Sequence, residues 1–92
     1  MKLFEMLRDM GYERSKVSSD ITHYEHGNTP VWVSVWVKKD GGFIVDVFIE
    51  TGKHRNKGLF SFLVPAEGTV AEKHVGWLKH AMIAAGITTG RG

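Results

Sequence analysis

Residues 31–37 read Val31-Trp32-Val33-Ser34-Val35-Trp36-Val37, an alternation of valine with larger or polar side chains. Successive side chains of an extended strand point to opposite faces. The four valines therefore share one side, and Trp32, Ser34 and Trp36 share the other. β-branched and aromatic residues also favour strands. The stretch predicts a strand with one face in a core and two tryptophans on the opposite face.

Three further strands are predicted around this one, each bounded by glycine, asparagine or proline. The strand after the Asp40-Gly41 turn again alternates, with Phe43, Val45, Val47 and Ile49 on one face. Short turns between successive strands imply an antiparallel meander. The expected strands cover residues 18–26, 31–37, 43–50 and 59–64, with turns at 27–30, 39–42 and 51–58, and Pro65 ends the last strand.

A helix is predicted at each end of the chain. The N-terminal helix has an apolar stripe that ends before Gly11, and the C-terminal helix begins at a Thr69-to-Glu72 capping box and ends at Gly86. The prediction is one α+β domain over residues 1–92, with a four-stranded antiparallel meander and both helices packed on the valine face (α-β-β-β-β-α). The apolar stripes are Leu3, Met6, Leu7 and Met10, and Ala71, Val75, Leu78, Met82 and Ala85.

Composition excludes several classes of protein. The chain has 92 residues and no cysteine, which excludes a disulfide scaffold, a thiolate zinc site and a cysteine nucleophile. The N-terminus carries charges where a signal peptide needs an apolar run, and no apolar stretch approaches the roughly 20 residues of a membrane span. These features predict a cytoplasmic protein that needs no cofactor.

The tryptophan face of the predicted sheet has no obvious cover. Trp32, Trp36, Ile44 and Phe48 point away from the expected helices, and Phe60 or Phe62 are candidates to join them. Large exposed apolar patches mark interfaces, and tryptophan is enriched among the residues that dominate binding energy. Three interpretations remain open: a protein or homodimer contact, stacking of unpaired bases, and a curled sheet that covers this face itself.

Two basic segments are further candidates for partner binding. Residues 53–92 carry six Lys or Arg against two Asp or Glu, which indicates either an anionic partner or an ordinary solvated face. The predicted 51–58 turn could reach phosphates or an acidic protein groove, or be only a soluble tip. Trp77 on the last helix suits a contact surface or caps the core edge. The candidate residues are Lys53, His54, Arg55 and Lys57 in the turn, and Lys73, Trp77 and His80 on the helix.

The histidines and serines form no catalytic or metal-binding motif. His23 and His26 are three apart in a predicted strand and so face opposite sides, and His74 and His80 do not share a helix face. No His-Glu-x-x-His pattern, phosphate-binding glycine motif or serine in a strained elbow is present. The sequence therefore favours a binding or inhibitory module without a catalytic or metal site.

Two stretches nevertheless resemble the small HicA-like toxins, which have a double-stranded-RNA-binding-like fold. Residues 1–12 resemble their first helix with its glycine-aromatic ending, and residues 78–87 resemble their closing helix. The resemblance implies an RNA-cleaving or RNA-binding domain with His23 as the catalytic base. The glycine-serine expected before that histidine is replaced by Asp20-Ile21-Thr22.

Over its whole length the chain resembles phage-encoded anti-CRISPR proteins that act on type I-F surveillance complexes. The opening residues 1–7 and the tryptophan strand, residues 31–37, carry this resemblance, together with the short domain without a catalytic signature. The resemblance implies a non-enzymatic inhibitor in the host cytoplasm. Such an inhibitor binds subunits of the CRISPR-Cas ribonucleoprotein, near its guide RNA or target-DNA path, and blocks target-DNA recognition.

Overall fold

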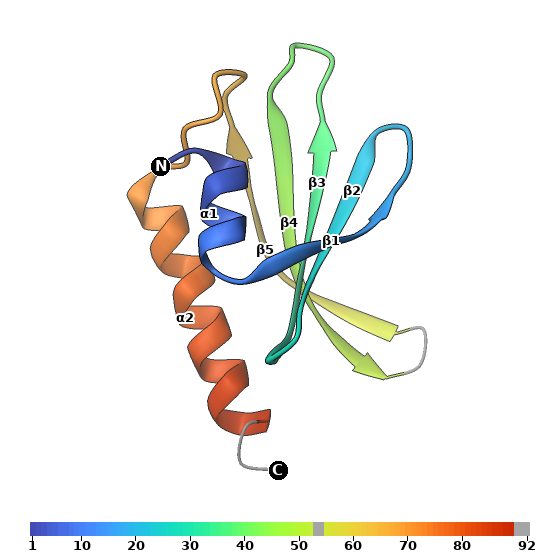
Figure 1. The fold of residues 1–92 in the computed structure, drawn as a ribbon, viewed down its shortest axis with the longest axis vertical. Helices are drawn as coiled ribbons and strands as arrows, with labels where there is room; N and C mark the ends of the chain where they lie inside the picture. The colour runs from blue at the N-terminus through green and yellow to red at the C-terminus, as the bar shows by residue number, and fades with distance from the viewer. Residues whose placement is uncertain (53–54, 90–92) are drawn as a thin grey trace.

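A computed structural model describes residues 1–52 and 55–89 of the chain (Figure 1). It has two layers, an antiparallel sheet of five strands and two helices that lie on the same side of that sheet. This confirms the α+β class and the meander. The elements are α1 (Leu3–Asp9), β1 (Tyr12–Val17), β2 (Ile21–His26), β3 (Thr29–Val37), β4 (Phe43–Gly52), β5 (Arg55–Val64) and α2 (Glu72–Thr89).

The sheet follows the chain, with strand order β1-β2-β3-β4-β5 and antiparallel pairing throughout. The centre of the sheet is the β3–β4 hairpin, in which Val33 pairs with Val47 and Val35 with Val45. Directly opposed residues point to the same face of a sheet. The predicted valine face is therefore continuous across the two central strands.

The core lies between this valine face and the two helices. Val31, Val33 and Val45 are fully buried, and Leu78 of α2 is buried against the same cluster. α1 contributes its stripe of Leu3, Met6 and Leu7. None of the described helices is long and apolar enough to cross a membrane.

α1 is held mainly by contacts far along the chain. It has seven residues, too few for a stable isolated helix in water. The Leu3 N–H donates to the Gly68 carbonyl at 2.8 Å, the Val70 N–H donates to the Met1 carbonyl at 2.9 Å, and Lys2 forms a β-bridge with Thr69. Backbone hydrogen bonds thus hold residues 1–3 against residues 68–70, which precede α2.

Gly11 turns the chain from α1 into β1 with a positive φ of 91°. A side chain is strained in this backbone conformation. A Cβ at Gly11 would also lie 2.7 Å from the His26 Nε2 atom, which hydrogen-bonds to the Met10 carbonyl at 2.8 Å. Glycine is therefore required here by both conformation and space.

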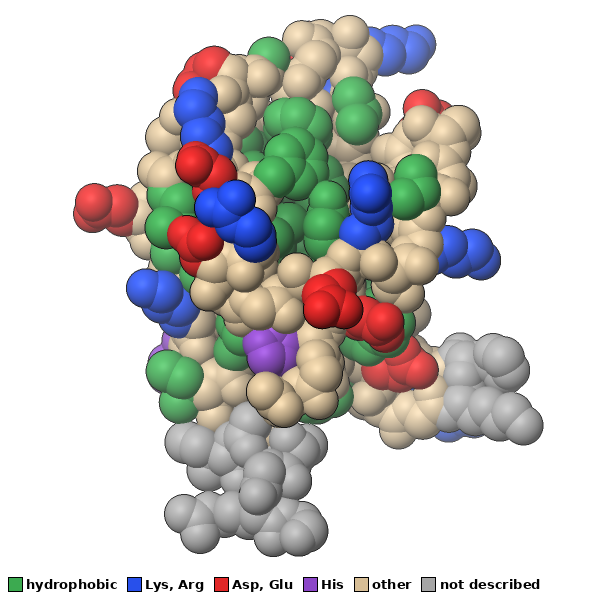
Figure 2. Space-filling view, viewed as in Figure 1, with side chains coloured by type: hydrophobic (Ala, Val, Ile, Leu, Met, Phe, Trp, Pro, Cys, Tyr) green, Lys and Arg blue, Asp and Glu red, His purple; other side chains and the backbone are tan. Residues whose placement is uncertain are grey.

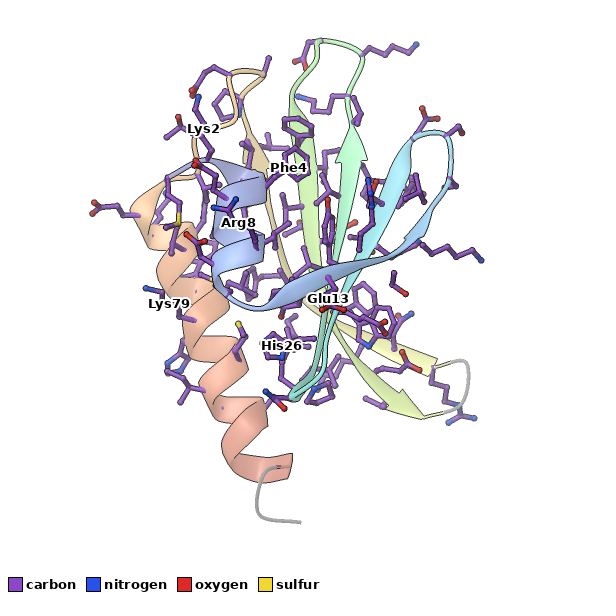
Figure 3. All side chains as sticks on the ribbon, viewed as in Figure 1. Lys2, Phe4, Arg8, Glu13, His26 and Lys79 are labelled. Atoms are coloured by element: carbon purple, nitrogen blue, oxygen red, sulfur yellow. The ribbon has the colours of Figure 1, made fainter. Side chains whose placement is uncertain are left out.

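An aromatic cluster closes the gap beside α1 on the helix side. Phe4 lies off the buried stripe and is half exposed, with its ring 5.6 Å from that of Phe43 and 6.4 Å from that of Tyr24. Figure 3 labels Phe4 on the side of α1 that faces the sheet, and Figure 2 shows hydrophobic side chains gathered in this region. The cluster extends the core to β2 and to the start of β4.

The prediction of four strands was wrong, because β1 was missed. β1 pairs with β2, and Ser18 and Asp20 lie in the connection between them, outside the strand that was expected to start at Ser18. Only Tyr12 of β1 is buried, and its hydroxyl donates to the Val31 carbonyl at 2.9 Å. Burial raises the pKa of Tyr12 above its ordinary value.

Several predicted element ends also differ. Thr29 and Pro30 belong to β3, so the predicted 27–30 turn contains only two turn residues. The Thr69 hydroxyl donates to the Glu67 carboxylate at 2.6 Å and does not cap α2, which begins at Glu72. α2 continues past Gly86 to Thr89, because a glycine lowers the stability of a helix without by itself ending it.

Two valines on the same face of β3 test this account of the core. Val33 is 0% exposed and Val37 is 54% exposed. We expect Val33→Ala to lower the free energy of unfolding by about 2 kcal/mol, from lost burial and the cavity that remains. Val37→Ala should change it by less than about 0.5 kcal/mol. Denaturant unfolding of both variants is the measurement, and equal losses would contradict the assignment of the valine face to the core.

Candidate functional site

The candidate site is the side of the sheet that faces away from the helices, called here the open face. The β3–β4 register places Trp32 opposite Phe48, Ser34 opposite Asp46, and Trp36 opposite Ile44 on this face. No element within residues 1–52 and 55–89 covers it, since α1 and α2 both pack on the valine side. The predicted placement of both tryptophans is therefore observed.

Aromatic side chains are partly exposed on the open face. Trp36 is 41% exposed. Trp32 is half-buried and stacks on Phe48, with ring centroids 6.3 Å apart and an interplanar angle of 19°. These rings sit on the two central strands, whose backbone is fixed by pairing on both sides. The open face thus presents preformed aromatic surface on a rigid support.

Phe60 and Phe62 do not join the open face. Phe60 pairs with Val47 and Phe62 with Val45, so both lie on the valine side, where Phe62 is buried in the core. The pairing shifts by one residue at Leu59, because Phe48 pairs with Gly58 while Val47 pairs with Phe60. This bulge fixes the side on which the β5 side chains lie.

A row of polar residues crosses the open face perpendicular to the strands. Paired positions in successive strands bring together one residue from each strand. Apolar side chains flank this row, with Trp36 and Ile44 on one side and Trp32 and Phe48 on the other. The polar row consists of Lys16, His23, Ser34, Asp46 and Ser61.

His23 and Ser34 are joined within the polar row. The His23 Nδ1 atom lies 2.7 Å from the Ser34 Oγ atom, a hydrogen-bond distance. Ser34 is 4% exposed, because its neighbours on the open face are much larger than it is. Ser34 is the only buried polar residue among those described, and this bond gives its hydroxyl a partner. His26 points to the opposite side of β2, as the sequence predicts.

A shallow cavity of about 570 Å³ lies over the polar row. Trp36 and Phe48 provide aromatic walls, and His23, Asp46 and Ser61 provide polar groups. The Asp46 side chain is half-buried, and it forms no hydrogen bond or ion pair with another described residue. The sequence placed Asp46 on this face, but only the pairing of the three strands β2, β3 and β4 shows that it lies near His23.

The predicted basic turn is not a turn over most of its length. Arg55 pairs with Gly52 and Lys57 pairs with Ile49, so both lie in β5, and both are exposed. Lys53 and His54 lie outside the described residues. Pairing with β4 extends the hairpin although the segment is polar and was expected to form a long turn. Arg55 and Lys57 therefore belong to one end of the sheet.

The candidate residues of α2 lie on the other side of the molecule from the open face. Lys73 and His80 are exposed, and Trp77 is 45% exposed. The Trp77 ring meets that of Phe60 edge to face at 5.6 Å and that of His74 at 4.8 Å. Trp77 therefore covers the core edge and is also accessible, and its role as a contact surface stays a prediction.

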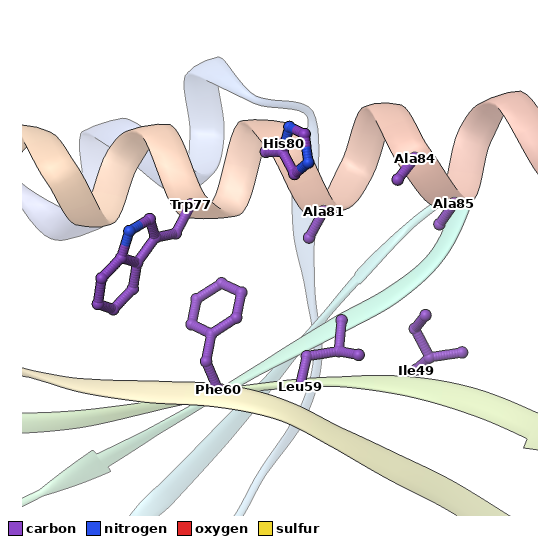
Figure 4. A pocket seen from close by; sticks show the side chains of 8 residues that line it. All are labelled: Ile49, Leu59, Phe60, Trp77, His80, Ala81, Ala84 and Ala85. Atoms are coloured by element: carbon purple, nitrogen blue, oxygen red, sulfur yellow. The ribbon is translucent and has the colours of Figure 1, made fainter.

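An apolar groove of about 540 Å³ separates the second half of α2 from β4 and β5 (Figure 4). Ile49, Leu59 and Phe60 line its floor. Small side chains of α2, including Ala81, leave the space open above them. His80 stands at its edge as the one histidine of the lining.

His74 was not singled out by the sequence, although it is the most constrained histidine of α2. Its ring stacks on Phe62 at 4.4 Å with an interplanar angle of 16°. Its Nδ1 atom is buried and has no hydrogen-bond partner among the described residues. Burial, and secondarily the charge of Lys73, lower the pKa of His74 below its ordinary value.

The described residues contain no group of three His, Asp or Glu side chains placed to hold a metal ion. Comparisons with protein-family models, with curated proteins and with solved structures find no match for this chain.

The lowered pKa of His74 makes stability depend on pH. The unfolded chain binds a proton at His74 more readily than the folded chain, so acidification from pH 7.5 to pH 5.5 favours unfolding. We expect His74→Phe, which keeps a ring against Phe62, to reduce this loss of stability. His80→Phe is the matched control on the exposed side of α2. Denaturant midpoints at both pH values measure the effect, and an unchanged pH dependence in His74→Phe would contradict it.

Proposed function

We propose that this chain is a non-enzymatic binding module and that the open face of its sheet is the contact surface. The observation that carries the proposal is the partly exposed Trp36 beside the stacked pair of Trp32 and Phe48, on a face that no described element covers. Folding alone gives no reason for this arrangement. The core is complete on the valine side, where Val33 and Val47 are buried without any contribution from Trp36.

Aromatic side chains on a rigid surface are well suited to binding. A tryptophan buries a large area when a partner covers it, and it loses little conformational entropy because it has only two side-chain torsions. Trp36 and Trp32 are held on paired central strands, so the surface needs little rearrangement to bind. These properties favour a contact that depends on a few central residues.

The whole-chain resemblance to anti-CRISPR proteins supplies a specific partner for this proposal. The chain then acts as a stoichiometric inhibitor that binds a type I-F CRISPR-Cas surveillance complex and prevents target-DNA recognition. A small domain with one preformed contact face is compatible with this role. Arg55 and Lys57 are exposed at the β4–β5 end of the sheet and offer positive charge to the phosphates of a ribonucleoprotein.

Paired tryptophan variants test the proposed surface. We expect Trp36→Ala to weaken binding to a purified type I-F surveillance complex at least tenfold, roughly 1.4 kcal/mol, because the partner covers this ring. Trp77→Ala removes a tryptophan of similar exposure from the opposite side and should leave the affinity unchanged. Calorimetric titration of the complex with each variant is the measurement, with target-DNA binding by the complex as the second readout.

Stability measurements on the same variants separate binding from folding. Trp36→Ala should lower the free energy of unfolding by less than the roughly 3–5 kcal/mol that a fully buried tryptophan contributes. Severe unfolding of Trp36→Ala would show that the residue is part of the core. Failure of the wild-type chain to bind the surveillance complex would refute the inhibitor role.

A second candidate function is an RNA-cleaving enzyme of the HicA-like type. The 2.7 Å contact between His23 and Ser34 favours it, because a histidine held by a hydrogen bond in an accessible cavity can serve as a general base. Ser34 itself is buried, which argues against its use as a nucleophile. The proposed binding function uses His23 only as a structural partner of Ser34.

The two candidate functions differ in the effect of His23→Ala. We expect the wild-type chain and His23→Ala both to leave a labelled RNA uncut, and His23→Ala to remain folded. The lost hydrogen bond should cost about 1 kcal/mol of stability. His80→Ala is the control for removal of an exposed histidine. RNA cleavage by the wild type that disappears in His23→Ala and persists in His80→Ala would replace the binding proposal by the nuclease.

A further inference from the structure

We propose that the cavity over the polar row receives an arginine side chain of the partner protein. This inference rests on the proposed function, because it assigns a chemistry to the same open face. Three features of that face carry it: the shape of the cavity, the Asp46 carboxylate that has no partner among the described residues, and the sign of the charge around it.

The cavity has apolar walls and a polar floor. Trp36 and Phe48 are its aromatic walls, on opposite sides of the polar row. Ser34, Asp46 and Ser61 form the floor between them. Gly58 of β5 is paired with Phe48 and has no side chain, so the Phe48 wall of the cavity is open at β5. A long side chain can therefore enter from the β5 edge and lie along the polar row.

Asp46 is the group that such a side chain would meet. Asp46 is half-buried and lines the cavity together with Trp36 and Phe48, and its carboxylate has no partner among the described residues. By contrast, the carboxylates of Asp40 and Glu67 each bind a lysine, at 3.3 Å and 3.0 Å respectively. A partly desolvated carboxylate gains most from a charged donor, because water no longer solvates it fully.

Charges across the open face have one predominant sign. The strand register places Glu13 opposite Glu25 on this face and also places Asp46 and Glu50 there. Among the described residues, Lys16 is the cation within the same area, while Lys38 is paired with Asp40 and Arg55 lies at the hairpin end of β5. The chain as a whole has a net charge of +2, so this acidic face runs against its composition.

The direct opposition of Glu13 and Glu25 disfavours an anionic partner at the open face. Like charges at paired positions of neighbouring strands destabilise a sheet. A cationic partner relieves this repulsion, and a nucleic acid increases it. The acidic open face therefore favours a basic protein segment over the stacking of unpaired bases.

Arginine fits the cavity better than lysine. Its planar guanidinium can stack on Trp36 or Phe48 and at the same time donate two hydrogen bonds to the Asp46 carboxylate. Its remaining N–H groups match the hydroxyl of Ser61. A lysine ammonium offers charge without the planar surface.

A titration with three small probes tests the proposal on the intact chain. N-acetyl-arginine amide is compared with its lysine analogue and with its citrulline analogue, which has nearly the same shape without the charge. The indole N–H signals of the three tryptophans are followed by NMR. We expect saturable shifts at Trp36, which lines the cavity, with arginine at concentrations on the order of millimolar, and none at Trp77. Lysine should bind more weakly, and citrulline should not bind.

Asp46→Asn keeps the size of the side chain and removes its charge. We expect it to weaken arginine binding roughly fivefold or more, since a charge-assisted bond becomes a neutral one. Asp20→Asn, in the connection between β1 and β2, is the matched control and should bind arginine as the wild type does. Equal shifts with citrulline, equal shifts at Trp77, or unchanged binding by Asp46→Asn would each overturn the arginine site.

A single-stranded oligonucleotide of eight thymidines serves as an anionic probe in the same NMR titration. Its binding at Trp36 and Trp32 with higher affinity than arginine would overturn the proposal in favour of an anionic partner.

The arginine proposal and the binding function can fail separately. If Trp36→Ala abolishes binding to the surveillance complex while arginine gives no shift, only the arginine site is wrong. If arginine binds while Trp36→Ala leaves the complex unaffected, the site is real and the proposed function is wrong.

Discussion

The valines of β3 and β4 form one apolar surface that meets the inner sides of α1 and α2. Val33 and Val47 are paired at its centre, and Leu7 and Leu78 cover it from the two helices. Burial of this surface is the main favourable contribution to folding that the structure displays. It also fixes the orientation of every other side chain on the two central strands, because the side chains of a strand alternate between two faces.

This constraint leaves the opposite face free to carry other chemistry. Trp36 and Asp46 are placed there by the same alternation that buries Val35 and Val45. Their side chains add little to the core, so the residue types on the open face are set by something other than folding. The pairing of Ser34 with His23 satisfies the polar group that lies deepest on this side. The open face is thus complete as part of the fold, and under the proposed function a partner supplies the donor that Asp46 lacks among the described residues.

Sequence patterns predicted the elements in which burial alternates strongly. The β3–β4 hairpin and the stripes of the two helices are of this kind, because each residue of the pattern has the same preference. β1 could not be predicted in this way. Its residues after Tyr12 are all exposed, and pairing with β2 at the sheet edge holds them extended. The polar start of β5 at Arg55 was missed for the same reason, since pairing with β4 outweighs its composition.

The residue pattern of a single strand does not show in which register that strand pairs with its neighbours. The single extra residue at Leu59 decides that Phe62 lies in the core, and nothing local to β5 indicates it. The proximity of His23 and Asp46 depends on the registers of two hairpins, and a slip of one residue in either would separate them. The candidate residues of the open face could be named from sequence, but their assembly into one cavity could not.

The β-bridge between Lys2 and Thr69 affects the order in which the parts of the chain fold. α1 is synthesised before the five strands, yet its backbone partners at Gly68 and Val70 follow all of them. A seven-residue helix does not persist alone in water, so Leu3, Met6 and Leu7 remain uncovered until the sheet has formed. Closure of this long loop makes productive folding a late, cooperative event. A nascent chain that has not yet released α2 from the ribosome therefore exposes the apolar surface most liable to aggregate.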